Sequence, residues 1–237
     1  MNSKLIIAAA IGIFIGFAGG FFLANSINRS AGMMQQPTTA AANPGLPNQP
    51  GAGGMQPPFA NMPGGGGAIA MVSDAIEKAK NEPDSFESQY NAANMYCPID
   101  RFEEAVKYYE QANRILPDHY QTIVRLGNSS YGLRKYDEAA RWYARALELQ
   151  PDDGDVRTDF GTTFFLREQK DLDRAVKEYK TSLEKNPEHE PTLQNLCAVY
   201  LEKGDRQGLE ETVAKLEKVN PQNPTIAKFR QELSMNK

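Results

Sequence analysis

The sequence predicts an all-α protein, an α-solenoid of about four helix hairpins with a packing helix at each end. Proline recurs at intervals of 34, 34, 36 and 34 residues, at Pro83, Pro117, Pro151, Pro187 and Pro221. Each interval holds two segments of helical length whose apolar residues are spaced three and four apart. Repeats of this size bury their apolar faces by stacking on their neighbours. The predicted repeats are 83–116, 117–150, 151–186 and 187–220.

The second repeat shows the pattern within one unit. Its first segment places Ile123 and Leu126 on one helix face, and its second segment does the same with Ala139 and Tyr143. Proline after the second segment stops that helix and suits the first turn of the next one. Residues that break or cap helices separate the two segments of each repeat, at Pro98 and Asp100, Gly132, Asp171, Gly204 and Asp205.

Small and aromatic residues also recur in register. One position holds Ala105, Ala139 and Ala175, and the position four residues later holds Tyr109, Tyr143 and Tyr179. A small side chain lets two helices approach closely, and an aromatic ring fills the space beside it. Because these residues recur at the same place in each unit, we interpret them as core and not as a ligand cage.

These residues resemble the tetratricopeptide repeat family, whose pattern runs W-x2-L-G-x2-Y, then A-x3-F-x2-A, then P. The second repeat matches through Leu126, Gly127, Ala139, Tyr143, Ala146 and Pro151, and the third through Phe160, Gly161, Phe164, Ala175, Tyr179 and Pro187. The first repeat departs at Gln89, and the fourth is the weakest, with Cys197 in the glycine position. The resemblance covers about residues 83–221 and implies a right-handed solenoid.

The resemblance also implies a binding surface. In this family the first helices of the repeats line a concave face, and the ligands are extended peptides or partner helices. The corresponding candidate residues here are Tyr90, Asn94, Val124, Asn128, Tyr131, Asp155, Thr158, Thr162, Phe165, Gln194 and Leu201. An asparagine amide can both donate to and accept from a peptide backbone. The alternative, that these are simply polar inner-face residues, stays open.

Some family members clamp a terminal carboxylate with basic residues on this face. Those positions hold Tyr90, Val124, Asp155 and Asp159 in this chain. The departure argues against a carboxylate clamp, and the two aspartates favour a neutral or basic ligand.

The ends of the array are predicted to be capped. Residues 68–82 form an N-terminal packing helix in this interpretation, and residues 222–237 form a C-terminal capping helix. Ile226, Phe229 and Leu233 are spaced for one face of that last helix. A solenoid needs such terminal elements because its outermost repeats lack a neighbour.

The N-terminal residues 1–29 are predicted to be a transmembrane signal-anchor. No charged residue lies between Lys4 and Arg29, and an apolar run of about 20 residues can span a bilayer. A cleaved signal peptide is the alternative. Gly12, Gly16 and Gly20 share one helix face, which favours helix–helix association and a homo-oligomer.

Lys4 before the span weakly favours an N-terminus inside the cell and repeats outside it, at the periplasmic side of a bacterial inner membrane. The opposite topology, with cytosolic repeats, is the alternative. Residues 30–67 are rich in Gly, Pro, Ala and Gln and carry no charge. We interpret them as a disordered linker, since they cannot bury enough apolar surface to fold.

Composition and the positions of Cys and His narrow the classes of function that the sequence predicts. All 30 acidic residues but only 24 of the 26 basic residues lie from Asp74 onward, so this part carries a net charge of −6 and is unsuited to nucleic acid. Cys97 and Cys197 lie three repeats apart, too far for a disulfide. His119 and His189 occupy helix starts, and no metal or cofactor motif is evident.

The sequence therefore predicts a non-enzymatic scaffold that binds protein or peptide partners at a membrane, in bacterial envelope complex assembly. Two alternatives remain. One is a cytosol-facing receptor for incoming proteins, and the other is a thiol-dependent accessory factor that uses Cys97.

Overall fold

The computed structural model describes residues 65–235, with side chains from Met71 onward. The expected membrane anchor 1–29, its glycines Gly12, Gly16 and Gly20, and nearly all of the expected linker lie outside the described residues. Within residues 65–235 every regular element is a helix, and none of these helices is long and apolar enough to cross a bilayer.

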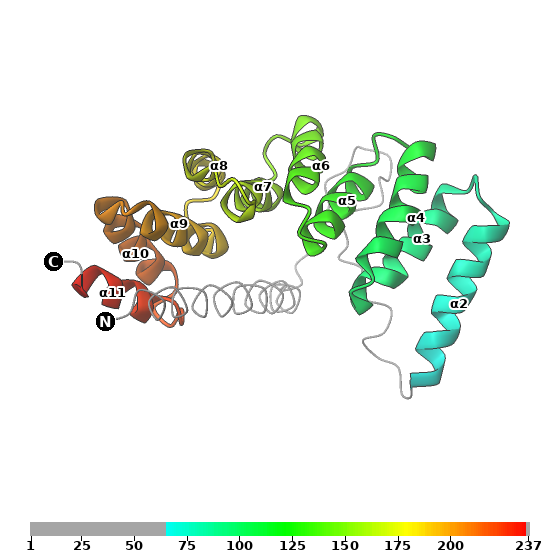
Figure 1. Ribbon diagram of the computed structural model, residues 1–237, viewed down its shortest axis with the longest axis horizontal. Coiled ribbons are helices and arrows are strands. Elements are labelled where there is room, and N and C mark those ends of the chain that lie inside the picture. Colours follow the sequence, from blue (N-terminus) through cyan, green and yellow to red (C-terminus); the bar gives the residue numbers. More distant parts are fainter. Residues whose placement is uncertain (1–64, 236–237) are drawn as a thin grey trace, which may run out of the picture. The chain divides into compact units, whose positions relative to one another are not determined.

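The described helices are consecutive and similar in length (Figure 1). They are α2 (Gly65–Asn81), α3 (Phe86–Tyr96), α4 (Phe102–Ile115), α5 (Tyr120–Gly132), α6 (Tyr136–Leu149), α7 (Gly154–Leu166), α8 (Leu172–Lys185), α9 (Glu190–Lys203), α10 (Arg206–Val219) and α11 (Ile226–Met235), with a short 3-10 turn η1 (Cys97–Ile99) after α3.

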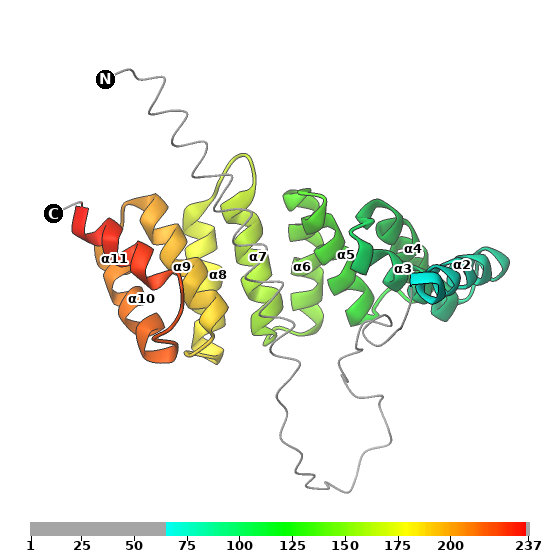
Figure 2. The same ribbon diagram turned by 90° about the horizontal axis from the view of Figure 1, so that it is seen from below.

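Four helix hairpins, α3/α4, α5/α6, α7/α8 and α9/α10, stack in chain order (Figure 2). The predicted all-α repeat fold is confirmed. Helix α2 packs on the first hairpin and begins at Gly65, slightly earlier than expected. Helix α11 packs on the fourth hairpin and buries Ile226, Phe229 and Leu233. The repeat array is therefore covered at both ends by a helix that belongs to no hairpin.

The first helix of each hairpin begins at a polar residue in extended backbone conformation. The side chains of Ser85, His119 and Asp153 each accept a hydrogen bond from the backbone N–H three residues later. His189 occupies the same place before α9. Such acceptors satisfy an N–H that has no partner within the helix. The two histidines therefore start helices, as their matched positions predicted.

A close contact between a glycine and a tyrosine ring forms the core of the second and third repeats. Tyr143 and Tyr179 are almost completely buried. A Cβ atom built on Gly127 would lie 2.6 Å from the Tyr143 ring, and one built on Gly161 would lie 2.8 Å from the Tyr179 ring. Glycine occurs here because the ring of the second helix lies directly on the backbone of the first helix.

The fourth repeat packs differently. The glycine position holds Cys197 and the tyrosine position holds Val213, both completely buried. The aromatic contact is instead reversed, since Tyr200 on α9 lies against Gly208 on α10, where an added Cβ would approach the ring to 2.8 Å. Cys197 is thus a core residue, which agrees with its predicted packing role.

Gly132 does not have its expected role. It was expected to permit the turn between α5 and α6, but it is the last residue of α5, and the positive φ of 59° belongs to Arg134. A Cβ atom on Gly132 would lie 2.7 Å from the ring of Phe102 in the preceding repeat. The absence of a side chain at Gly132 therefore allows a close contact between the first and second repeats. Gly204, by contrast, has a φ of +69° and ends α9 as expected.

Substitution of Gly127 tests the glycine–tyrosine contact. We expect Gly127→Ala to lower the free energy of unfolding by about 1–3 kcal/mol, because the buried Tyr143 ring must move to admit a methyl group. Gly154→Ala is the matched control, since its added Cβ would meet only Ser182 Oγ at 3.4 Å. The control should change stability by less than about 0.5 kcal/mol. Equal effects of the two substitutions in urea denaturation would contradict this account.

Candidate functional site

Asn94 and Asn128 are held in the same way in the first and second repeats. The Tyr109 hydroxyl donates to Asn94 Oδ1 at 2.7 Å, and the Tyr143 hydroxyl donates to Asn128 Oδ1 at 2.8 Å. Each bond joins the first helix of a repeat to its second helix. The buried tyrosine thereby fixes the orientation of the amide and leaves the Nδ2 hydrogens for another acceptor.

The third repeat has Thr162 at the matching position. The Tyr179 hydroxyl lies 2.9 Å from Thr162 Oγ1, which itself donates to the Thr158 carbonyl oxygen. Asn195 on α9 also donates to Thr162 Oγ1, at 3.3 Å. The repeated link to the second-helix tyrosine is therefore kept, with a hydroxyl in place of an amide.

Thr158, Thr162 and Phe165 do not lie on an accessible surface, contrary to their assignment to the binding face. Thr158 and Thr162 are only 4% and 3% exposed, and Phe165 is 9% exposed. The short threonine side chains end within the contact between helices, where other protein groups satisfy them. These three residues therefore pack beneath the exposed side chains of their helix.

The other candidate residues are at least partly exposed. Tyr90, Asn94, Val124, Asn128, Tyr131, Gln194 and Leu201 are half-buried, and Asp155 is exposed. We call these eight residues the binding face. All of them come from the first helices α3, α5, α7 and α9. Whether they contact a ligand stays a prediction.

An aromatic cluster extends the binding face in the first repeat. The ring of Phe86 stacks on Tyr90 with centroids 5.6 Å apart, and the His119 ring meets Tyr90 edge-on at 5.5 Å. This cluster was not among the residues predicted from the sequence. Phe86 lies one helical turn before Tyr90, which could have indicated it, but the approach of His119 from the next repeat has no local signal.

The two cysteines are free thiols, of which Cys197 is buried and Cys97 is partly exposed. Cys97 Sγ lies 3.6 Å from the Tyr109 hydroxyl and 3.7 Å from Ser129 Oγ, between the first and second repeats. Burial raises the pKa of Cys197 to about 12, so this thiol stays protonated at neutral pH. Neither environment resembles the electropositive pocket that activates a catalytic thiol.

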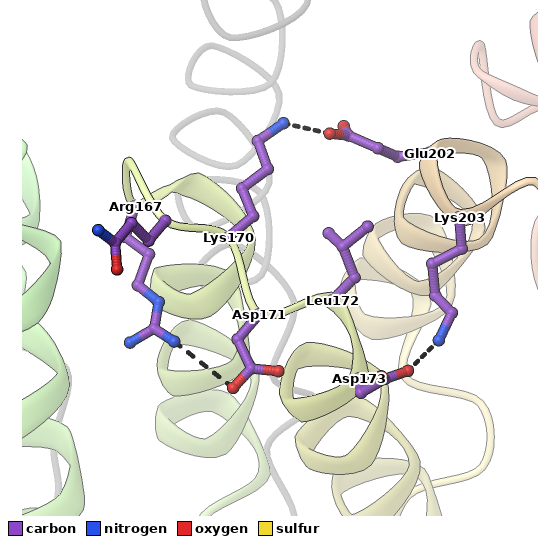
Figure 3. A pocket seen from close by; sticks show the side chains of 8 residues that line it. Arg167, Lys170, Asp171, Leu172, Asp173, Glu202 and Lys203 are labelled. Atoms are coloured by element: carbon purple, nitrogen blue, oxygen red, sulfur yellow. Dashed lines mark hydrogen bonds and ion pairs between the residues drawn. The ribbon is translucent and has the colours of Figure 1, made fainter.

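A shallow hollow lies beside residues 167–171, the turn that we expect to hold the two extra residues of the third repeat (Figure 3). Its charged side chains pair with one another: Lys170 with Glu202, Lys203 with Asp173, and Arg167 with Asp171. The first two pairs join the third repeat to the fourth. The hollow is therefore lined by ion pairs that join the third repeat to the fourth. In the described part of the chain, no group of His, Cys, Asp or Glu is suited to a metal ion.

Family models described as tetratricopeptide repeat match residues 86–119, 121–153 and 166–233. The first two matches each cover nearly one of the repeats defined by the prolines. No curated protein matches the sequence.

Solved structures with the same fold include YrrB, titled a TPR protein with an unusual peptide-binding site. It has 21% sequence identity and a TM-score of 0.62, over 70% of this chain and 84% of YrrB. MamA from Desulfovibrio magneticus RS-1 has 18% identity and a TM-score of 0.61, over 67% of this chain and 89% of that one. Another MamA crystal structure has 17% sequence identity and a TM-score of 0.57, over 69% of this chain and 86% of that one. At sequence identities this low, the structural similarity shows the fold alone. With four stacked hairpins and three matching family models, the chain belongs to the tetratricopeptide repeat family.

Proposed function

We propose that this protein is a non-catalytic scaffold, anchored by its N-terminal segment, whose binding face holds an extended segment of a protein partner. Assembly of bacterial envelope complexes is the process that we propose it serves. The fold supports the first part of this proposal, because a solenoid presents a long continuous surface built from successive repeats.

The repeated asparagine–tyrosine link is the observation that carries the proposal. Asn94 and Asn128 each have Oδ1 occupied by a tyrosine hydroxyl from inside the repeat. An amide fixed in this way is a preorganised N–H donor, which costs little further side-chain entropy when a ligand carbonyl binds. Such a donor in two successive repeats suits a ligand with a regularly repeated acceptor, such as a peptide backbone.

The side chains around these amides indicate the class of partner. Tyr90 and Tyr131 offer flat apolar surface of the kind that dominates protein interfaces. Asp155 places a carboxylate further along the binding face. A neutral or basic segment with an apolar side chain fits this surface better than an acidic segment. The peptide-binding site described for YrrB supports the same class of ligand.

The membrane part of the proposal is supported by sequence. Residues 5–24 are apolar, and the charges that flank them favour repeats on the periplasmic side. Self-association through Gly12, Gly16 and Gly20 would make the scaffold multivalent, so that several weak peptide contacts act together.

The binding face is tested by photo-crosslinking of the full chain in native membranes. A photoreactive amino acid at Val124 should crosslink a partner, while the same group at Gln111, an exposed residue of the second helix α4, should not. Asn94→Ala combined with Asn128→Ala should weaken the Val124 crosslink, because two hydrogen bonds worth roughly 1–3 kcal/mol in total are lost.

The matched control for this double substitution is Gln111→Ala, which removes an exposed amide from the other side of the hairpin. Circular dichroism must show that both variants stay folded. Equal crosslinking from Val124 and Gln111, or an unchanged yield in the asparagine variant, would contradict a ligand site on the binding face.

The topology is tested separately with a reporter fused to the C-terminus. We expect alkaline phosphatase fused after Lys237 to be active, since this enzyme needs an oxidising compartment to form its disulfides. Green fluorescent protein fused at the same position should then show no fluorescence, because it would be exported unfolded. The reverse result would favour the cytosol-facing receptor.

A further inference from the structure

The first helices of the four repeats differ in how completely they are enclosed. In α3 and α5 the buried residues come singly or in pairs, such as Ala92 and Ala93 on α3. In α7 an unbroken run of four residues, 160–163, is buried, and in α9 a run of six residues, 195–200. Because one turn of a helix holds 3.6 residues, a run of four or more leaves no side of the helix open at that level. Helices α3 and α5 therefore keep an open side, whereas α7 and α9 are each enclosed over a full turn.

Helices α7 and α9 enclose each other through direct contacts. Thr158 Oγ1 on α7 lies 2.6 Å from Thr192 Oγ1 on α9, and both side chains are buried. Asn195 on α9 donates from Nδ2 to Thr162 Oγ1 on α7 at 3.3 Å. The Oδ1 atom of Asn195 is also buried, so the one asparagine of these two helices is turned into the protein. A ligand on this side would have to separate the two helices.

The start of α9 is covered by the segment that leads into the capping helix. Asn223, which lies between α10 and α11, is itself buried. Its Nδ2 atom donates to Glu190 Oε1 at 2.7 Å and to Gln194 Oε1 at 3.3 Å. These bonds use polar groups of α9 that would otherwise be available to a ligand.

The first two repeats differ from the last two at the position of the oriented amides. Asn94 and Asn128 are half-buried, and each turns Oδ1 toward a buried tyrosine hydroxyl and keeps Nδ2 for another acceptor. The corresponding residues of the last two repeats are Thr162 and Ala198, which are both buried. Within the described part of the chain, this position therefore offers a ligand amide donors in the first two repeats only.

The aromatic cluster lies in the same two repeats. Phe86 and Tyr90 come from α3, and His119 precedes α5, with ring centroids between 4.7 and 5.6 Å apart. Val124 occupies the position of Tyr90 in the second repeat and is half-buried. An apolar side chain of a partner could bury its surface on these rings, which is the kind of contact that dominates the energetics of interfaces.

The charges on α3 and α5 cancel. Each of these helices contains one acidic or basic residue, Glu87 on α3 and Arg125 on α5, and both are exposed. Burial lowers the pKa of His119, so its ring adds no charge at neutral pH. A strongly charged segment of either sign therefore meets no matching net charge on these two helices. They offer apolar contact and hydrogen bonds to carbonyl groups instead.

We propose that the partner segment is bound by the first two repeats alone, and that it is an uncharged, extended segment with one aromatic or aliphatic anchor side chain. The anchor packs on the aromatic cluster, and backbone carbonyl groups of the segment accept from Asn94 and Asn128. Asp155, at the start of α7, marks the border of the contact. This inference rests on the proposed function and narrows the part of the binding face that contacts the partner.

Val124 and Gln194 test which repeats bind, because they occupy the same position in the second and fourth repeats and are both half-buried. A photoreactive amino acid is placed at each of them in turn, in the full chain and in native membranes. Val124 should crosslink the partner, and the yield from Gln194 should fall to the background given by the exposed Gln111 of α4. Equal yields from Val124 and Gln194 would overturn the inference.

A second experiment tests the anchor, with the photoreactive group at Gln121, an exposed residue of α5. Tyr90→Ala should lower the crosslink about fivefold or more, because a central aromatic contact carries much of the binding energy of an interface. Leu201→Ala is the matched control, since it shortens a half-buried apolar side chain of α9 and should leave the yield unchanged. Circular dichroism must show that both variants stay folded. An unchanged yield with Tyr90→Ala, or equal losses in the two variants, would overturn the inference.

Salt tests the charge of the partner segment. The crosslink from Val124 should change less than about twofold between about 0.05 M and about 0.5 M salt, since salt screens only charged contacts. A fall of about tenfold over this range would show that a charged segment binds, which overturns the assignment of an uncharged partner.

The crosslinking results separate this inference from the proposed function. A crosslink from Val124 without one from Gln194 supports both. Crosslinks from both positions keep the proposed function and remove the restriction to the first two repeats. A crosslink from Gln194 alone removes that restriction as well. No crosslink from either position removes the proposed function, and this inference with it.

Discussion

The contact between a second-helix tyrosine and the first-helix backbone is the interaction on which the rest of the structure depends. At Gly127 and Gly161 the first helix has no side chain, so the ring of Tyr143 or Tyr179 lies against its backbone. This contact sets how closely the two helices of a hairpin approach. The hydroxyl of the same ring then reaches the next residue along the first helix and orients Asn128 or contacts Thr162. Packing and the candidate binding surface thus share one side chain.

The fourth repeat shows that this arrangement can be changed without loss of the fold. Cys197 and Val213 replace the glycine and the tyrosine, and Tyr200 packs on Gly208 in the opposite sense. Without a tyrosine hydroxyl at this place, α9 has Ala198 where α5 has Asn128. The loss of the ring and the loss of the oriented amide occur together, as expected if one supports the other.

The junction between the third and fourth repeats depends on polar contacts more than the preceding ones. Lys170–Glu202 and Lys203–Asp173 join it at one end, and Asp155–His189 joins it at the other. Between the first and second repeats, aromatic contacts of His119 take the corresponding place. The binding face therefore spans one junction with aromatic contacts and one with polar contacts.

The sequence by itself determined the number of hairpins, the buried tyrosines, the histidines at helix starts and the apolar face of the last helix. These features follow from period and helix-start chemistry, which are local and repeat in register. Only the tertiary structure decided that Thr158 and Thr162 are buried. It also decided that the Phe102 ring packs on Gly132 and that His189 contacts Asp155. Those outcomes depend on how far a side chain reaches across a helix contact, and on which side chain the neighbouring repeat places opposite it.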